Sequence, residues 1–148
     1  MKAGNKNRLI IQLKRYSILA TVLVFSLMSS RSVLQNPVWV APKDAEGLKN
    51  PLAGNTTANA DIGKLYIANC GPCHGDKGRG DGPAAPGLNP KPADHTSAAI
   101  QKESDGAIFW KISTGRSPMP GYKTIFSEQQ RWELVNYIRT LAKAGKKK

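Results

Sequence analysis

The chain has 148 residues and a formal net charge of +12, which is enough for one small domain with charged ends. Most of the charge lies outside the middle of the chain: residues 59–142 hold ten basic and eight acidic side chains, a net charge of only +2. No basic patch is interleaved with aromatic residues, and no zinc-finger spacing occurs. The composition therefore argues against nucleic-acid binding.

Residues 1–32 are predicted to be an export signal. Five basic residues precede an apolar run of 13 residues at 16–28 (YSILATVLVFSLM). This length suits a signal peptide better than a membrane-spanning helix, which needs about 20 residues. Cleavage and retention as a membrane tether through residues 9–30 both stay open, because no Ala-x-Ala site follows. Either way, the positive-inside rule places the rest of the chain in the periplasm or on the outer face of the cytoplasmic membrane.

Residues 33–58 are predicted to be a linker, because they carry three prolines and no apolar period. Trp39 in this segment is either an interfacial anchor or part of an arm packed on the domain, and the sequence favours neither. The last segment, residues 143–148, is a basic tail with four lysines. It either steers docking to an acidic partner or keeps the protein soluble.

The domain at 59–142 is predicted to be all-α, with about three helices joined by long loops. The first helix covers 61–70, where apolar residues recur at helical spacing. The second starts at Ser104 or Asp105 and stops at Gly115. The Gly- and Pro-rich stretches between the helices hold neither a long helix nor a central strand.

The third helix has the strongest signals. Ser127 and Gln130 form a capping box before it. Its apolar stripe consists of Trp132, Val135, Ile138 and Leu141. Three helices in so short a domain leave it short of apolar core, so a disulfide, a metal or a cofactor is expected to stabilise it.

The segment C-G-P-C-H at 70–74 admits several chemistries. A thioredoxin-like dithiol would open a long helix after a strand, but here a helix precedes Cys70 and glycines follow His74. A zinc site of Cys70, Cys73, His74 and His95 would place two ligands side by side in the chain, which suits one tetrahedral ion poorly. A structural disulfide would leave the missing core unexplained.

Covalent haem attachment accounts for the segment best. Cys-x-x-Cys-His is the attachment signature of c-type haem, in which two thiols bond one porphyrin. Cys70 and Cys73 are then the tethers, and His74 is the proximal iron ligand. The predicted export agrees with this interpretation, because bacteria attach haem in this way outside the cytoplasm.

Residues 59–142 resemble the class I, monohaem c-type cytochromes of bacteria. The resemblance rests on the C-G-P-C-H segment, on Met119 in S-P-M-P-G-Y, and on the final helix R-W-E-L-V-N-Y-I-R-T-L. It implies a small cytochrome c fold wrapped around one covalently bound haem c, with Met119 as the distal ligand. His95 is the rival ligand, but its polar loop predicts an ordinary exposed histidine.

The resemblance also implies supporting roles. The carbonyl of Pro83 is expected to accept a hydrogen bond from the second ring nitrogen of His74. Further residues are expected at the crossing of the first and last helices, or in contact with the haem or the core: Gly63, Tyr66, Tyr137, Trp110 and Tyr122.

The function expected from these features is one-electron transfer outside the cytoplasm, between redox proteins or with a membrane respiratory complex, without enzymatic activity. Two alternatives stay open: a haem c subunit of a larger membrane oxidoreductase complex, and a haem-based binder of small ligands. A thiol–disulfide oxidoreductase is the least favoured interpretation.

Overall fold

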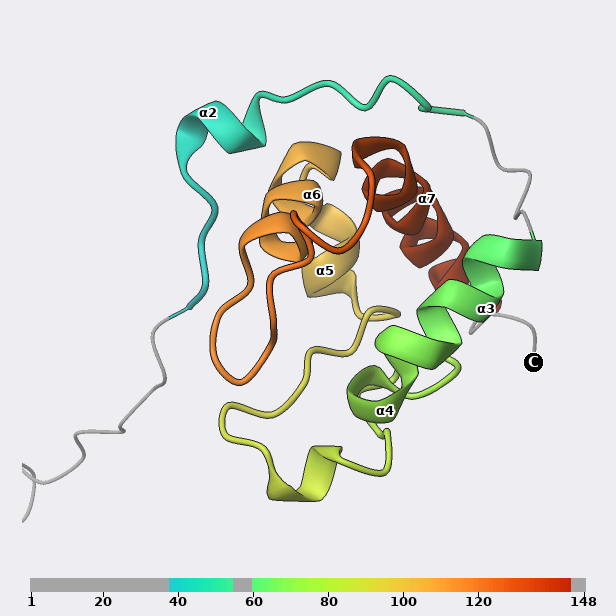
Figure 1. Cartoon of the computed structure of the whole chain (residues 1–148). Helices are drawn as coiled ribbons and strands as arrows, with labels where there is room; N and C mark the ends of the chain where they lie inside the picture. Colours follow the sequence, from blue (N-terminus) through green and yellow to red (C-terminus); the bar gives the residue numbers. More distant parts are fainter. Residues whose placement is uncertain (1–37, 55–59, 145–148) are drawn as a thin grey trace, which may run out of the picture. The chain divides into compact units, whose positions relative to one another are not determined.

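The computed structural model describes residues 38–54 and 60–144 (Figure 1). The helices in these ranges are α2 (Lys43–Glu46), α3 (Ala60–Asn69), α4 (Gly71–His74), the 3-10 turn η1 (Ala85–Gly87), α5 (Ala98–Lys102), α6 (Asp105–Thr114) and α7 (Glu128–Ala144). No strand occurs within these ranges; the one β-type pairing there is an isolated bridge between Arg116 and Met119. The all-α prediction is therefore confirmed.

The three predicted helices correspond to α3, α6 and α7, and their ends follow local chemistry. At the start of α6, Ser104 Oγ accepts a hydrogen bond from the Ala107 N–H at 3.1 Å. The helix ends at Gly115, whose φ of 69° lies in the left-handed region that favours glycine. Before α7, the Gln130 N–H donates to Ser127 Oγ at 3.1 Å, and the Ser127 N–H donates to Gln130 Oε1 at 2.9 Å. These two bonds form the predicted capping box.

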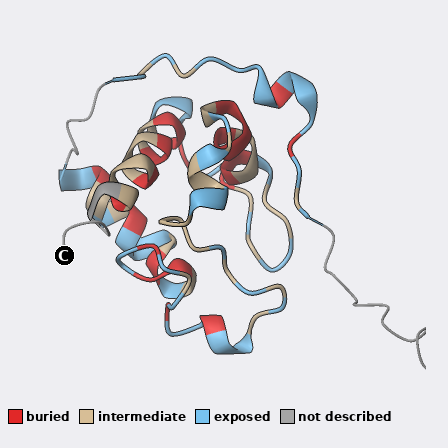
Figure 2. Cartoon of the chain, turned by 180° about the vertical axis from the view of Figure 1, so that it is seen from behind, coloured by how far each residue is buried: buried red, intermediate tan, exposed pale blue. Residues whose placement is uncertain are grey.

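The core lies between α3, α6 and α7 (Figure 2). The whole apolar stripe of α7 is buried, and Tyr66, Leu134 and Val135 are the largest side chains that are fully enclosed. At the crossing of α3 and α7, the Gly63 backbone approaches Tyr137, and the rings of Tyr66 and Tyr137 lie 4.9 Å apart. The residues expected at this crossing therefore meet there.

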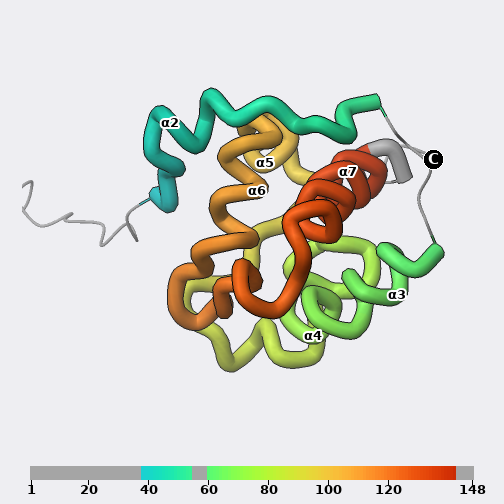
Figure 3. The backbone as a smooth tube through the Cα atoms, turned by 45° about the horizontal axis from the view of Figure 1, so that its top comes forward, coloured from blue at the N-terminus to red at the C-terminus, as the bar shows by residue number. Residues whose placement is uncertain are grey.

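Residues 38–54 differ from the predicted linker: they form an arm that packs on the domain (Figure 3). Ala41 and Ala45 are buried against Ala107 of α6. The contact is close, because a Cβ atom on Gly106 would lie 2.1 Å from the Ala45 carbonyl oxygen. Small side chains on both sides allow this approach, and they carry no periodic signal in the sequence.

Several predictions fall on other parts of the chain. The predicted leader at 1–32, the two ends of the predicted linker (33–37 and 55–58) and most of the basic tail lie outside the described residues. Among the helices that are described, none is long and apolar enough to cross a membrane.

Candidate haem-attachment site

The two cysteines lie on one helical turn. Cys70 follows α3 directly and begins α4, where its carbonyl accepts hydrogen bonds from the N–H groups of Cys73 at 3.1 Å and His74 at 2.8 Å. Its own N–H donates to the carbonyl of Tyr66 at 2.7 Å. Both thiols are free and half-buried. Because residues three apart are neighbours on a helical turn, this segment presents two sulfur atoms to one bound group.

Cys70 lacks the electrostatics of a reactive dithiol. Burial, and secondarily the neighbouring Cys73, raises the pKa of the Cys70 thiol to about 12. A reactive thiolate instead needs its pKa lowered, commonly by the N-terminus of a long helix. Since α4 has only four residues, no such helix follows. The structure thus argues against disulfide chemistry and leaves the sulfurs suited to act as tethers.

His74 is a neutral imidazole, and one of its two ring nitrogens is hydrogen-bonded to the backbone. Its ring is buried, and Nδ1 lies 2.9 Å from the carbonyl oxygen of Ala93. Burial lowers the pKa of His74, and the bond to Ala93 opposes this shift. Because a carbonyl only accepts hydrogen bonds, Nδ1 carries the proton and Nε2 keeps its lone pair. This is the tautomer that binds a metal through Nε2.

The acceptor for His74 is not the predicted Pro83, which is exposed. The reason lies in the path of the loop. The N–H groups at 80, 82 and 84 donate to the carbonyls of His74, Cys73 and Pro72. This part of the loop is therefore bound to the backbone of residues 70–74, the attachment turn. The segment that contains Ala93 then crosses the imidazole, because the His95 N–H donates to the Gly78 carbonyl at 2.6 Å.

His95 is not the exposed histidine that the polar loop predicts. Its ring stacks on His74 with the centroids 4.0 Å apart and an interplanar angle of 20°, and its Nδ1 lies 2.8 Å from Tyr66 Oη. Burial, with a smaller contribution from His74, lowers the pKa of His95 to about 3, so its ring is neutral. The structure thus places His95 next to His74, with its Nδ1 bonded to Tyr66.

Met119 lies at the turn between α6 and α7. It pairs with Arg116 through two backbone hydrogen bonds: the Met119 N–H donates to the Arg116 carbonyl at 2.8 Å, and the Arg116 N–H donates to the Met119 carbonyl at 3.0 Å. The half-buried Met119 side chain packs against the main apolar cluster, and Cys70 packs against the same cluster. Both predicted ends of the site thus border one core.

Tyr122 follows Met119 by three residues and contacts the chain next to Cys70. Its hydroxyl donates to the Asn69 carbonyl at 3.0 Å, next to Cys70, and its ring stacks on Phe126. Burial is the main reason why the pKa of Tyr122 rises to about 12, so the phenol stays protonated. Trp110 packs against Trp39 of the arm instead. The sequence left the roles of Tyr122 and Trp110 open, and it carried no signal for Ala93.

Two thiols and a neutral imidazole whose Nδ1 is hydrogen-bonded lie within residues 70–74, and these groups fit a covalently attached haem. Within residues 38–54 and 60–144, no three side chains of the types His, Cys, Asp and Glu are grouped so that they could hold a metal ion.

Comparison with known proteins agrees with this assessment. Residues 60–142 match the family model described as Cytochrome c. Among solved structures, the chain is similar to one in the reducing HAO-like protein complex of Kuenenia stuttgartiensis, with 28% sequence identity and a TM-score of 0.52. The match covers 73% of this chain and 52% of that one, so the chain spans about half the length of that protein. No curated protein sequence matches this chain significantly.

Proposed function

Because this chain belongs to the cytochrome c family, we propose that it is an electron carrier in which His74 and Met119 are the axial ligands of one haem c. The observation that carries the proposal is the state of His74. A neutral imidazole, fixed through Nδ1 to the Ala93 carbonyl, directly follows a cysteine of the attachment turn. This arrangement orients Nε2 and makes it a more basic ligand for a metal.

Each residue has a separate role. Cys70 and Cys73 tether the group through thioether bonds, and His74 supplies the proximal nitrogen. When bound, haem c supplies an iron that alternates between ferric and ferrous states and so transfers one electron.

Met119 supplies the distal sulfur in this proposal. Its turn is stiffened by Pro118 and Pro120, which restrict the backbone on either side of it. A neutral thioether ligand raises the reduction potential relative to a second histidine. If His74 and Met119 both bound the iron, the group would supply electron transfer without turnover of a substrate, and this is the activity proposed.

The proposal places the domain outside the cytoplasm, on the basis of the predicted leader. The partners are redox proteins or a membrane respiratory complex. A second candidate is a haem c subunit of a larger oxidoreductase complex. The structural similarity to a chain of a protein complex supports this candidate.

The test is a visible spectrum of the exported protein, made with a competent haem-attachment system. The parent is expected to bind haem covalently and to show a six-coordinate, low-spin spectrum with the weak iron–methionine band in the ferric form. Met119→Ala should abolish that band, and Met119→His should lower the reduction potential sharply.

His95→Gln is the matched variant, because it removes the rival ligand. It should keep the iron–methionine band. Loss of low-spin character in His95→Gln, together with an unchanged Met119→Ala spectrum, would contradict the ligand assignment. Absence of covalent haem in the parent would contradict the proposal as a whole.

A further inference from the structure

The arm at 38–54 reaches the turn that carries Met119. The Trp39 ring lies 6.0 Å from the Trp110 ring of α6, measured between centroids. The Arg116 guanidinium lies over the same Trp39 ring at 5.0 Å, and the Lys111 ammonium lies 5.6 Å from it. Trp39 therefore contacts both α6 and the first residue of the Met119 turn.

Met119 is the residue of that turn that packs against the main apolar cluster, and it is only half-buried. Its neighbours Ser117, Pro118 and Pro120 are exposed. Two backbone hydrogen bonds between Arg116 and Met119 close the turn, so the backbone of Met119 is fixed directly to that of Arg116. Beyond the turn, the chain is fixed again where the Tyr122 N–H donates to the Ile112 carbonyl at 2.9 Å.

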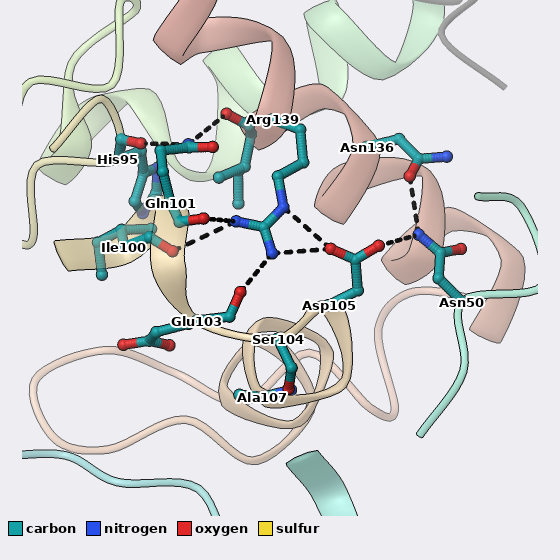
Figure 4. A network of polar contacts seen from close by, with 11 residues as sticks. Asn50, His95, Ile100, Gln101, Glu103, Ser104, Asp105, Ala107, Asn136 and Arg139 are labelled. Carbon is teal, nitrogen blue, oxygen red and sulfur yellow. Dashed lines mark hydrogen bonds and ion pairs between the residues drawn. The ribbon is translucent and has the colours of Figure 1, made fainter. Parts of the chain in front are cut away.

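The other end of the arm is fixed by a polar network (Figure 4). Asn50 Nδ2 donates to Asp105 Oδ2 and to Asn136 Oδ1, both at 2.8 Å. Asn136 Nδ2 in turn donates to the Leu52 carbonyl at 2.8 Å. Asp105 also pairs with Arg139 of α7 at 2.7 Å. Since Ala45 is buried against α6 between the two ends, the arm is held along its length and can serve as a fixed support.

We propose that Trp39 is a positioning residue for Met119: its ring holds Arg116 and thereby keeps the Met119 turn in place for iron ligation. The inference rests on the proposed function. Its physical basis is a cation–π contact, which is worth most when the aromatic ring is partly desolvated, as it is here between the arm and α6.

The test measures how readily imidazole displaces Met119 from the ferric iron in the full-length, haem-loaded protein. Trp39→Leu keeps an apolar side chain against Trp110 but removes the aromatic face. It should bind imidazole about 3- to 10-fold more tightly than the parent, the size expected for the loss of the cation–π contact with Arg116; the contact of Lys111 is lost as well, but Lys111 lies outside the Met119 turn. Trp39→Phe keeps the face and should stay close to the parent. Val40→Ala changes an exposed neighbour and should leave the affinity unchanged.

Arg116→Gln is an independent test, because it leaves the packing of Trp39 on Trp110 intact. It should also tighten imidazole binding, and the double variant with Trp39→Leu should show less than the sum of the two effects. If Trp39→Leu does not bind haem, the imidazole affinity of Arg116→Gln is compared with that of Trp39→Phe, and this comparison decides the question. Parent-like imidazole affinity in Arg116→Gln, or full additivity in the double variant, overturns the inference.

Met119→Ala separates this inference from the proposed function. If Met119→Ala does not change imidazole binding, Met119 is not the ligand and the proposed function fails. If Met119→Ala tightens binding but Trp39→Leu and Arg116→Gln do not, only the role of Trp39 fails.

Discussion

The crossing of α3 and α7 and the loop at 75–97 support His74 by different means. The crossing is packed through side chains: Tyr66 is fully buried, and its ring lies 4.9 Å from that of Tyr137. The loop is held largely by backbone hydrogen bonds, such as the one from the Gly80 N–H to the His74 carbonyl at 2.8 Å, and by close backbone approaches at glycines. The helices supply stability, whereas the loop sets the orientation of the imidazole. Substitutions in the two regions should therefore differ in what they impair.

The largest expected effect is in the helical core. Trp132 is 3% exposed, and its ring stacks on Phe109 with the centroids 3.9 Å apart. Trp132→Ala should lower the free energy of unfolding by about 3–5 kcal/mol, because it removes buried surface and leaves a cavity. Urea unfolding followed by circular dichroism measures the change. Ile125→Ala, at an exposed position, is the control, and equal losses in both variants would refute a core role for Trp132.

The next effect is in the loop. A Cβ atom on Gly82 would lie 2.4 Å from the carbonyl oxygens of Gly71 and Pro72, so Gly82→Ala must shift the attachment turn. We expect a loss of about 1–3 kcal/mol, typical of overpacking, together with a lower yield of covalently attached haem. Gly87→Ala is the matched control, since nothing lies within 4 Å of its added Cβ. A Gly82→Ala protein with parent-like haem content would show that the loop does not set the site.

A smaller effect tests the connection between the two regions. Gln101 Nε2 donates to the His95 carbonyl at 2.7 Å and to the Ile138 carbonyl of α7 at 3.1 Å (Figure 4). Gln101→Leu should destabilise the protein by about 1–2 kcal/mol, because two partly buried carbonyls lose a donor. Hydrogen exchange should increase in the loop more than in α7. Gln129→Leu, at an exposed position on α7, is the control, and uniform exchange in both segments would argue against a connecting role.

The smallest effect has the opposite sign. A Cβ atom on Gly63 would lie 3.5 Å from Tyr137 Cε2, which is ordinary van der Waals contact. Gly63→Ala should therefore raise the free energy of unfolding by up to about 1 kcal/mol, because alanine costs less backbone entropy in a helix. Thermal unfolding measures the change. A clear loss would mean that the crossing is too tight for a methyl group, as the loop is at Gly82.

The helices were predictable because their signals are local. Apolar spacing indicated α3 and α7, and the capping residues Ser104 and Ser127 lie next to the helices that they start. The acceptor for His74 was not predictable, because Ala93 lies 19 residues away and offers only a backbone carbonyl. The same holds for His95, whose polar neighbours predicted exposure although its ring packs on His74 and Tyr66.

Residue types and short spacings were enough to identify the groups that can hold a haem, namely two thiols and a histidine within five residues and one thioether in the domain. They were also enough to predict three helices. Tertiary structure decided which groups orient these side chains. It placed the Ala93 carbonyl on His74, stacked the His95 ring on the His74 ring, and turned the predicted linker into an arm that brings Trp39 to Arg116. Such contacts join residues far apart in the chain, and they depend on backbone paths that residue types alone do not specify.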